Sequence, residues 1–153
     1  MASEYVSFML VFSLGISMVV GITASMQNIS ESVFETSANV ELEKIADKIT
    51  GIIINGVAYE HQWTGNVSYE VSIDLTRLLV NKYSYEFTTS LDSDNYNLVG
   101  RTVGTSTNVT YSQSLSLNSN DAVISGIISS SSSNGYISFT KSDTAIVIIF
   151  GNR

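Results

Sequence analysis

Few side chains in this sequence could carry out catalysis or bind a metal ion. His61 is the only histidine and there is no cysteine, so a His-based triad, a multi-histidine metal site and a thiolate site are all excluded. Beside Trp63, in an expected strand or turn, His61 is predicted to be structural. The sequence also lacks a glycine-rich phosphate loop and an obvious pair of catalytic carboxylates. We therefore predict a protein that is not an enzyme and that uses no cofactor or metal.

The spacing of Asp92 and Asp94 resembles the start of a calcium-binding loop. The rest of that pattern fails where an oxygen ligand, a glycine and a closing glutamate are required, because these positions hold Tyr96, Asn97 and Val103. We therefore expect Asp92-Ser93-Asp94-Asn95 to form a plain hairpin turn.

Three Asn-x-Ser/Thr triplets occur in the chain, beginning at Asn28, Asn66 and Asn108. This triplet is the acceptor pattern for N-glycosylation when it is exposed outside the cell. Because about a quarter of the residues are Ser or Thr, a similar number of triplets is expected by chance. The triplets are compatible with export and mark three candidate glycan sites.

The composition is apolar and poor in charge. Hydrophobic residues make up 44% of the chain and charged residues 14%, against about 25% charged in a soluble domain. The net charge is −7 without a basic cluster, which argues against binding to nucleic acid or anionic lipid. The 153 residues leave room for a helical anchor plus one domain of about 100 residues.

The anchor is the uncharged stretch of residues 5–26, YVSFMLVFSLGISMVVGITASM. As a helix, its 22 residues would extend about 33 Å, enough to cross a hydrocarbon core of about 30 Å. A cleaved secretory signal would need a basic start, a shorter apolar core and an Ala-x-Ala-like site. A buried helix of a soluble protein is the other alternative. We expect a transmembrane helix with residues 1–4 inside and the rest of the chain outside, an orientation that rests on composition and the triplets.

Small residues recur every four positions along this helix, at Ser13, Ser17, Gly21 and Ser25. Small side chains at that spacing let another helix approach closely, which is how transmembrane helices associate. A chance origin is the alternative in so serine-rich a chain. The pattern nevertheless predicts a helix-packing face.

An amphipathic stalk is expected to follow the anchor. Its apolar residues recur at spacings of three and four, at Phe34, Ala38, Leu42, Ile45, Ile49 and Ile52. Lys44 lies three residues from both Glu41 and Asp47, close enough for weak pairing. Asn55-Gly56 is a stop and turn signal. Since no proline interrupts the chain, we predict one nearly continuous helix from about Tyr5 to Ile54 whose outer half packs on a sheet or on another subunit.

Beyond Val57 the hydrophobic period changes from that of a helix to that of a strand. Alternation of apolar and polar residues predicts strands over 69–75, 83–87 and 109–117, and a further strand is predicted over 136–140. The continuous apolar run from Ala145 to Phe150 predicts a strand that is buried on both faces. Gly100 and Gly104 are predicted turns, and Ser129 to Ser133 a flexible loop.

The predicted fold class is therefore α+β. A long N-terminal helix, first hydrophobic and then amphipathic, is followed by an antiparallel β-sandwich-like domain or a curled sheet laid on the helix. The expected organisation is a transmembrane or filament-core helix over 1–26, an amphipathic stalk over 27–56 and an extracellular β-rich domain over 57–153.

This layout resembles the archaeal type IV pilin-like proteins, which include archaellins, adhesion pilins and archaellum accessory proteins. The resemblance lies in the Ser3-Glu4 start, the apolar helix of residues 5–26, its amphipathic extension to Ile54 and the β-rich remainder. It covers the full length as architecture, but only the first 50 or so residues carry a recognisable pattern. It implies a filament whose core is a bundle of apolar helices and whose surface is made of β domains.

Two departures from the family bear on processing. No basic-glycine leader precedes Met1, so we expect either a mature end or a protein that a prepilin peptidase never cleaves. Glu4 also lies one position short of the glutamate that bacterial pilins carry near the mature end. In a helix bundle, the Glu4 carboxylate could pair with the α-amino group of a neighbour and set the axial register between subunits.

The expected function is that of a structural filament subunit, a major or minor pilin, with other copies or the pilus and archaellum machinery as partners. The alternative is a membrane-anchored surface module or archaellum accessory or stator protein that contacts the S-layer, a glycan or another protein. An exported enzyme is a weaker hypothesis than either.

Overall fold

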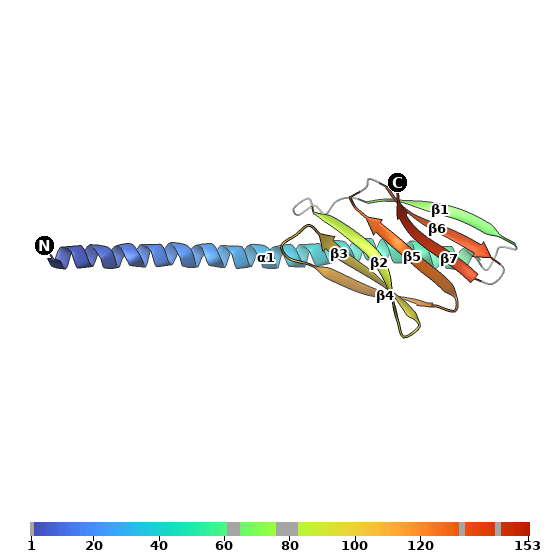
Figure 1. The fold of residues 1–153 in the computed structure, drawn as a ribbon, viewed down its shortest axis with the longest axis horizontal. Helices are drawn as coiled ribbons and strands as arrows, with labels where there is room; N and C mark the ends of the chain where they lie inside the picture. Colours follow the sequence, from blue (N-terminus) through green and yellow to red (C-terminus); the bar gives the residue numbers. More distant parts are fainter. Residues whose placement is uncertain (1, 61–64, 76–82, 132–133, 143–144) are drawn as a thin grey trace. The chain divides into compact units, whose positions relative to one another are not determined.

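The computed structural model describes the chain except for residues 1, 61–64, 76–82, 132–133 and 143–144. The described residues fall into two compact units, residues 1–36 and residues 37–153. The fold is α+β, with one long N-terminal helix followed by a seven-stranded, mostly antiparallel sheet (Figure 1). The predicted fold class is confirmed.

The helix α1 runs from Ala2 to Glu60. It continues through the polar residues Asn28 and Ser30 without a break, so the predicted continuity of residues 5–54 is confirmed. Three hydroxyls, including those of Thr23 and Thr36, donate to the carbonyl oxygen four residues earlier and so stay satisfied inside the helix.

The predicted helix end at Asn55-Gly56 is wrong, because α1 continues to Glu60. Gly56 is buried under aromatic side chains of the sheet, and a Cβ placed there would lie 2.4 Å from Cε1 of Phe139 and 2.6 Å from the Tyr69 hydroxyl oxygen. Gly56 therefore lets the helix approach the sheet. Here tertiary packing overrides the local turn preference of the Asn-Gly pair.

The seven strands of the described residues belong to one sheet. They are β1 (Val67–Asp74), β2 (Ser84–Asp92), β3 (Asn95–Val103), β4 (Thr110–Asn118), β5 (Ala122–Ser129), β6 (Asn134–Ser142) and β7 (Ala145–Asn152). Their order is β1-β6-β7-β5-β2-β3-β4, and β5 and β7 form the parallel pair among otherwise antiparallel neighbours. The single sheet corresponds to the curled-sheet form of the prediction, and the described residues form no second sheet that faces it.

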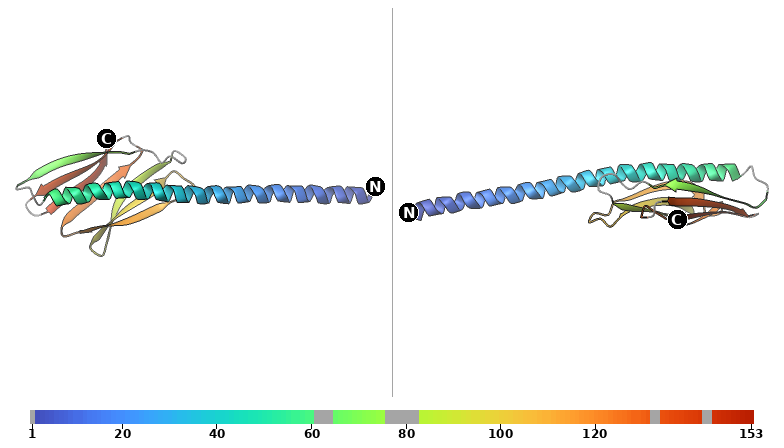
Figure 2. Two further views of the ribbon diagram at one scale, coloured as in Figure 1. Left: turned by 180° about the vertical axis from the view of Figure 1, so that it is seen from behind. Right: turned by 90° about the horizontal axis from the view of Figure 1, so that it is seen from above.

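Within residues 37–153, the last part of α1 lies across one face of this sheet (Figure 2). Leu42, Ala46, Ile49 and Ile53 are fully buried on the helix side. From the sheet, the largest fully buried side chains are Tyr85, Phe87, Ile73, Leu98, Leu115, Ile128, Ile137 and Ile148. Burial of these apolar side chains is what holds the helix to the sheet.

The buried helix face is rotated slightly from the predicted one. Ile45 and Ile52 were expected in it but are only half-buried, whereas Ala46 and Ile53 are fully buried. The small side chain of Ala46 allows close packing, and the bulkier isoleucines lie at the flanks of the contact.

The prediction that Ala145 to Phe150 is buried on both faces is also wrong. Ile146, Ile148 and Phe150 face the helix and are buried, while Ile149 on the opposite face is 41% exposed. Because the helix covers only one face of the sheet, β7 alternates between a buried and a partly exposed side.

The predicted turns have mixed outcomes. Ser93 and Asp94 adopt left-handed φ angles of 47° and 74° between β2 and β3, so the hairpin turn at residues 92–95 is confirmed. Gly104, with φ of 77°, follows β3 as predicted. Gly100 instead lies inside β3, where a Cβ would meet the Phe87 ring at 2.5 Å, so that prediction is wrong.

The serine run was predicted to be a flexible loop, but its first residues are buried and bonded. Ser130 accepts a hydrogen bond from the Tyr85 amide at 2.8 Å, and the Ser129 amide donates to Asn152 Oδ1 at 3.0 Å. Residues 132 and 133 lie outside the described part of the chain.

Candidate assembly surface

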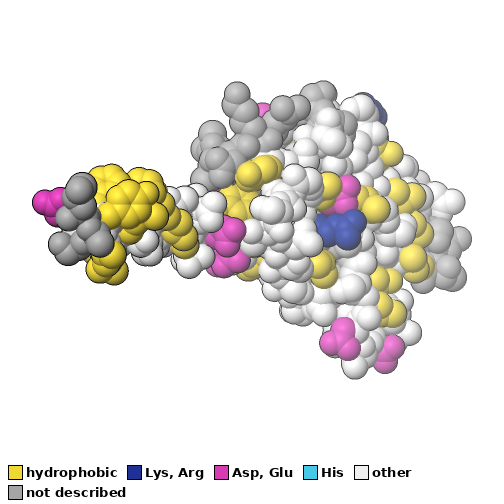
Figure 3. Space-filling model, turned by 60° about the vertical axis from the view of Figure 1, so that its left-hand side comes forward, with side chains coloured by type: hydrophobic (Ala, Val, Ile, Leu, Met, Phe, Trp, Pro, Cys, Tyr) yellow, Lys and Arg dark blue, Asp and Glu magenta, His cyan; other side chains and the backbone are white. Residues whose placement is uncertain are grey.

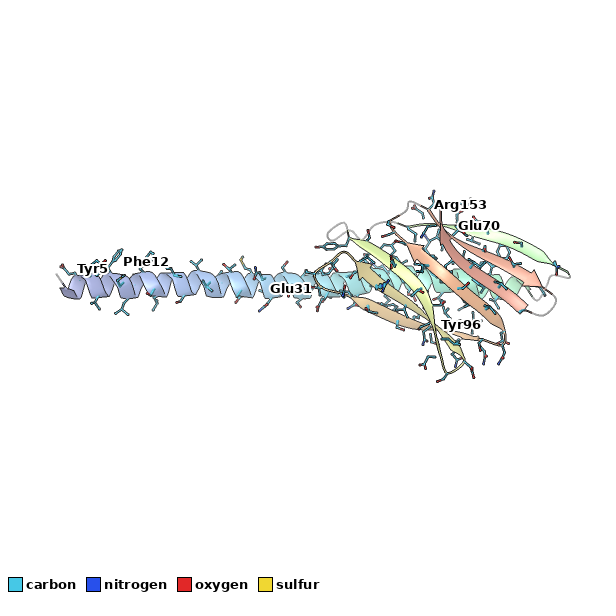
Figure 4. All side chains as sticks on the ribbon, viewed as in Figure 1. Tyr5, Phe12, Glu31, Glu70, Tyr96 and Arg153 are labelled. Atoms are coloured by element: carbon cyan, nitrogen blue, oxygen red, sulfur yellow. The ribbon has the colours of Figure 1, made fainter. Side chains whose placement is uncertain are left out.

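The first unit presents a helix surface made almost wholly of exposed apolar side chains. From Tyr5 to Val33, every large hydrophobic side chain is at least half exposed; the extremes are Ile16 at 50% and Val11 at 73%. Tyr5 and Phe12 project away from the helix axis (Figure 4), and hydrophobic side chains cover this part of the helix in Figure 3. By length and composition, this helix could cross a membrane. It is therefore compatible with a membrane anchor.

The predicted small-residue stripe lies on this exposed surface. Ser13, Ser17, Gly21 and Ser25 are all exposed, and a Cβ placed on Gly21 would meet nothing within 4 Å. The Ser17 hydroxyl donates to the carbonyl oxygen of Ser13 at 2.9 Å. With that donor satisfied inside the helix, Ser17 can enter an apolar contact without an unpaired hydroxyl proton.

A second apolar feature centres on Gly15, which the stripe does not include. An open hollow of about 480 Å³ lies over this glycine, lined by Val11, Phe12, Ile16, Val19 and Val20. Gly15 is two residues from both Ser13 and Ser17, which places it about 200° around the helix from each of them. The helix thus carries a small-residue face and, on the other side, a wider apolar hollow. In the sequence, this hollow corresponds to Val11, Gly15 and Val19, which follow one another at intervals of four residues, with the glycine between two β-branched residues.

Glu4 lies in the first turn of α1 and is exposed. A carboxylate at that position interacts favourably with the positive end of the helix dipole. A structural role in starting the helix and the predicted role in pairing with a neighbour are compatible with each other.

The three candidate glycan sites differ in their surroundings. Asn28 is exposed but lies within α1, far from either end of the helix. Asn66 and Asn108 are exposed in the non-helical segments that lead into the two edge strands, β1 and β4. Only the latter two therefore lie in the extended or looped backbone that carries surface glycans.

The second unit has a few ordered polar contacts on its surface. Lys44 pairs with Glu41 at 3.4 Å, as its spacing predicted, and Asp47 instead accepts a hydrogen bond from Gln113 of β4 at 3.1 Å. Glu70 and Arg153 form an ion pair, and both are labelled in Figure 4. These contacts are partly exposed, so each adds little to stability.

Tyr85 and Tyr111 of this unit both have a raised pKa. Burial raises the pKa of Tyr85 to about 12, with smaller contributions from the negative charges of Asp74 and Glu41. Desolvation, followed by the charges of Glu43 and Asp47, raises the pKa of Tyr111 as well. Neither phenol is shifted toward the range in which a tyrosine would act as a base near neutral pH.

Among the residues that the structure describes, the remaining candidates for chemistry do not come together into a site. Among the described residues, no group of three or more His, Asp or Glu side chains is arranged to hold a metal ion. Asp92 and Asp94 flank a tight hairpin turn. His61 and Trp63 lie outside the described residues.

No protein-family model matches this chain, and no curated protein or solved structure is significantly similar to it.

Proposed function

We propose that this protein is a structural subunit of a surface filament of the archaeal type IV pilus or archaellum kind, a major or minor pilin. Its N-terminal helix would first anchor it in the membrane and then pack among the helices of other copies. The observation that supports this most is the unbroken exposure of apolar side chains along the helix from Tyr5 to Val33. So much apolar surface requires lipid or protein to cover it.

Two features favour protein over lipid as the final cover. A helix that contacts only lipid needs a hydrophobic surface of no particular shape. This helix has a small-residue stripe and a hollow over Gly15, into which side chains of another helix can pack. Helix association in an apolar medium depends on such close packing, because there is no hydrophobic driving force between helices there.

The two faces also differ from each other, which matters for the type of assembly. A contact between unlike faces of two copies is heterologous, and it leaves one of each face free for the next copy. Repetition of such a contact gives an open-ended assembly when the rotation between copies does not close a ring. A filament is the assembly expected from this arrangement.

The test is the size of the native protein on extraction. Membranes or sheared cells containing the full chain are solubilised in mild detergent, separated by sedimentation and imaged by electron microscopy. A filament subunit should be recovered in long polymers with the helix protected from protease. Recovery only as a small particle with the mass of one chain plus detergent would contradict the proposal.

The second candidate is a surface module, anchored alone, or an accessory protein that binds the S-layer, a glycan or another protein. It is favoured by apolar side chains on the sheet face opposite the helix, where Val123, Ile127 and Ile149 are 46%, 49% and 41% exposed. These residues come from β5 and β7, which are adjacent at the centre of the sheet. The small-particle outcome of the same experiment would favour this candidate.

A further inference from the structure

An open polar hollow of about 420 Å³ lies where β3 leads into β4. Its lining includes Glu86 of β2, Arg101 of β3, Gly104 and Asn108 of the connection, and Thr110 of β4. The other lining residues are Thr102 and Val103 of β3, so the lining is charged or polar apart from Val103 and Gly104.

The connection that forms one side of the hollow is held in place by Thr102. The Thr102 hydroxyl accepts a hydrogen bond from the Val109 amide at 3.0 Å, and the Thr102 amide donates to the Val109 carbonyl at 3.0 Å. Both side chains are buried, at 3% and 5% exposed. Asn108 directly precedes this fixed point and is itself exposed, so its position at the hollow is set by the fold.

Arg101 and Glu86 supply a paired donor and acceptor at the surface, where their side chains are 59% and 25% exposed. Both Nε and Nη2 of Arg101 donate to the same atom, Oε2 of Glu86, at 3.3 and 2.9 Å. Within the described residues, this leaves Nη1 of Arg101 and Oε1 of Glu86 without a hydrogen-bond partner. A guanidinium donor beside a carboxylate acceptor suits the hydroxyl groups of a saccharide, each of which donates and accepts.

The first and third residues of an N-glycosylation triplet, Asn108 and Thr110, both line this hollow. We infer that Asn108 carries an N-linked saccharide whose first sugars lie in the hollow against Arg101 and Glu86. The inference rests on the part of the proposed function that places this unit outside the cell.

The modification is a glycosyl transfer from a sugar donor activated as a diphosphate ester. A bond forms between Asn108 Nδ2 and the anomeric carbon, and the bond from that carbon to the diphosphate breaks. The diphosphate leaves with its electron pair, and the amide nitrogen loses one proton. The chain contributes the acceptor amide of Asn108 and the hollow in which the attached sugars then lie.

Two positions in the chain serve as matched controls. Asn66 is an exposed triplet asparagine ahead of the other edge strand, so Asn66→Gln controls for Asn108→Gln. Arg153 is an exposed arginine paired with a glutamate elsewhere on the surface, so Arg153→Ala controls for Arg101→Ala.

The experiment uses the full chain from its native cells or from a host that glycosylates exported proteins. Glycopeptide mass spectrometry reports the occupancy of Asn108, and hydrogen–deuterium exchange reports the protection of residues 104–110. In the parent, we expect a saccharide on Asn108 and exchange of these amides several-fold slower than in Asn108→Gln. Arg101→Ala should keep the saccharide but lose most of that protection, whereas Arg153→Ala should lose neither.

An unmodified Asn108 would overturn the inference, and so would a modified Asn108 whose protection is the same in the parent and in Arg101→Ala. Electron microscopy of the same samples separates this outcome from the proposed function. Filaments with an unmodified Asn108 would overturn only the glycan site, and glycosylated single particles would overturn only the filament.

Discussion

Gly56 of the helix lies directly against the ring of Phe139 on β6. A Cβ added to Gly56 would lie 2.4 Å from Cε1 of that ring, and the ring is stacked on Tyr69 with centroids 4.7 Å apart. Because Phe139 is only 3% exposed, it has little room to move aside. This contact explains why an Asn-Gly pair persists inside a helix, and it fixes how closely the helix and sheet approach.

The first prediction compares two glycines of the helix. Alanine at either position gains about 1 kcal/mol of helix propensity, but overpacking a core contact costs about 1–3 kcal/mol. Gly56→Ala should therefore lower the free energy of unfolding despite that gain, and Gly51→Ala, where a Cβ meets nothing within 4 Å, should raise it. Urea unfolding of the full chain in detergent measures both. Equal effects of the two substitutions would show that the Phe139 contact is unimportant.

The second prediction concerns stability at high pH. Tyr85 has its pKa raised to about 12 in the folded state, against about 10 in the unfolded chain. Between these values the unfolded state has released the phenolic proton and the folded state has kept it, so stability falls as the pH rises. The contribution of the protonated Tyr85 phenol to the free energy of unfolding is fully present below a pH of about 10 and is lost toward pH 12.

Tyr85→Phe should flatten that fall in the free energy of unfolding, measured by urea titration at a series of pH values. Tyr59→Phe, which removes the hydroxyl of a tyrosine that is 59% exposed, is the matched control. If Tyr85→Phe loses stability with pH as steeply as the parent does, burial of this phenol is not the cause.

The third prediction tests the hairpin turn. Asp94 has φ of 74°, which β-branched residues adopt only at a cost of about 1–2 kcal/mol. Asp94→Val should therefore lower the unfolding temperature, while Asp94→Gly should leave it close to that of the parent. Because the calcium-loop pattern is broken after Asp94, added calcium should not change the unfolding temperature of the parent. A clear calcium-dependent rise would contradict the assignment as a plain turn.

The fourth prediction concerns the small-residue stripe of the anchor. Gly21 and Ser17 are exposed in the single chain, so Gly21→Leu or Ser17→Leu has no effect on the fold of residues 37–153. Either substitution should block close approach of a neighbouring helix and lower the sedimenting fraction several-fold. Circular dichroism of the same variants checks that the sheet is intact. Undiminished assembly in both variants would mean that the stripe is accidental.

The fifth prediction concerns Glu4. If its carboxylate pairs with the α-amino group of a neighbour, Glu4→Gln should reduce assembly sharply, without changing membrane insertion or the β-rich unit. If Glu4 serves only the helix dipole, the loss is limited to a few tenths of a kcal/mol of helix stability and assembly persists. Sedimentation of the two proteins side by side distinguishes these results.

The helix and most of the sheet could be predicted because their patterns are local. The apolar run, the amphipathic spacing and the absence of proline are enough to predict an unbroken helix, and two-residue alternation indicates the strands at 69–75 and 136–140. The turn at Asp92 to Asn95 was predictable for the same reason, since its residue types directly favour left-handed angles.

The errors arise where a residue's role depends on a distant partner. Gly56 and Gly100 look like turn residues, yet each makes room for an aromatic ring, Phe139 or Phe87. Ala46 was overlooked because a small side chain gives a weak hydrophobic signal, although it is fully buried. The hollow beside Asn108 could not be foreseen either, because it joins residues from β2, β3 and β4.

The central claim is that helix 5–26 packs among copies of itself, and the absence of cysteine in the chain allows a direct measurement. The variant Val20→Cys carries a spin label at an apolar position of the helix. Its electron paramagnetic resonance spectrum is recorded in membranes and in the protein extracted from them. We predict broadening by neighbouring labels that disappears when the labelled protein is assembled with an excess of unlabelled copies. A narrow spectrum that is the same at every dilution would contradict the claim, because it would show that each helix lies alone in lipid.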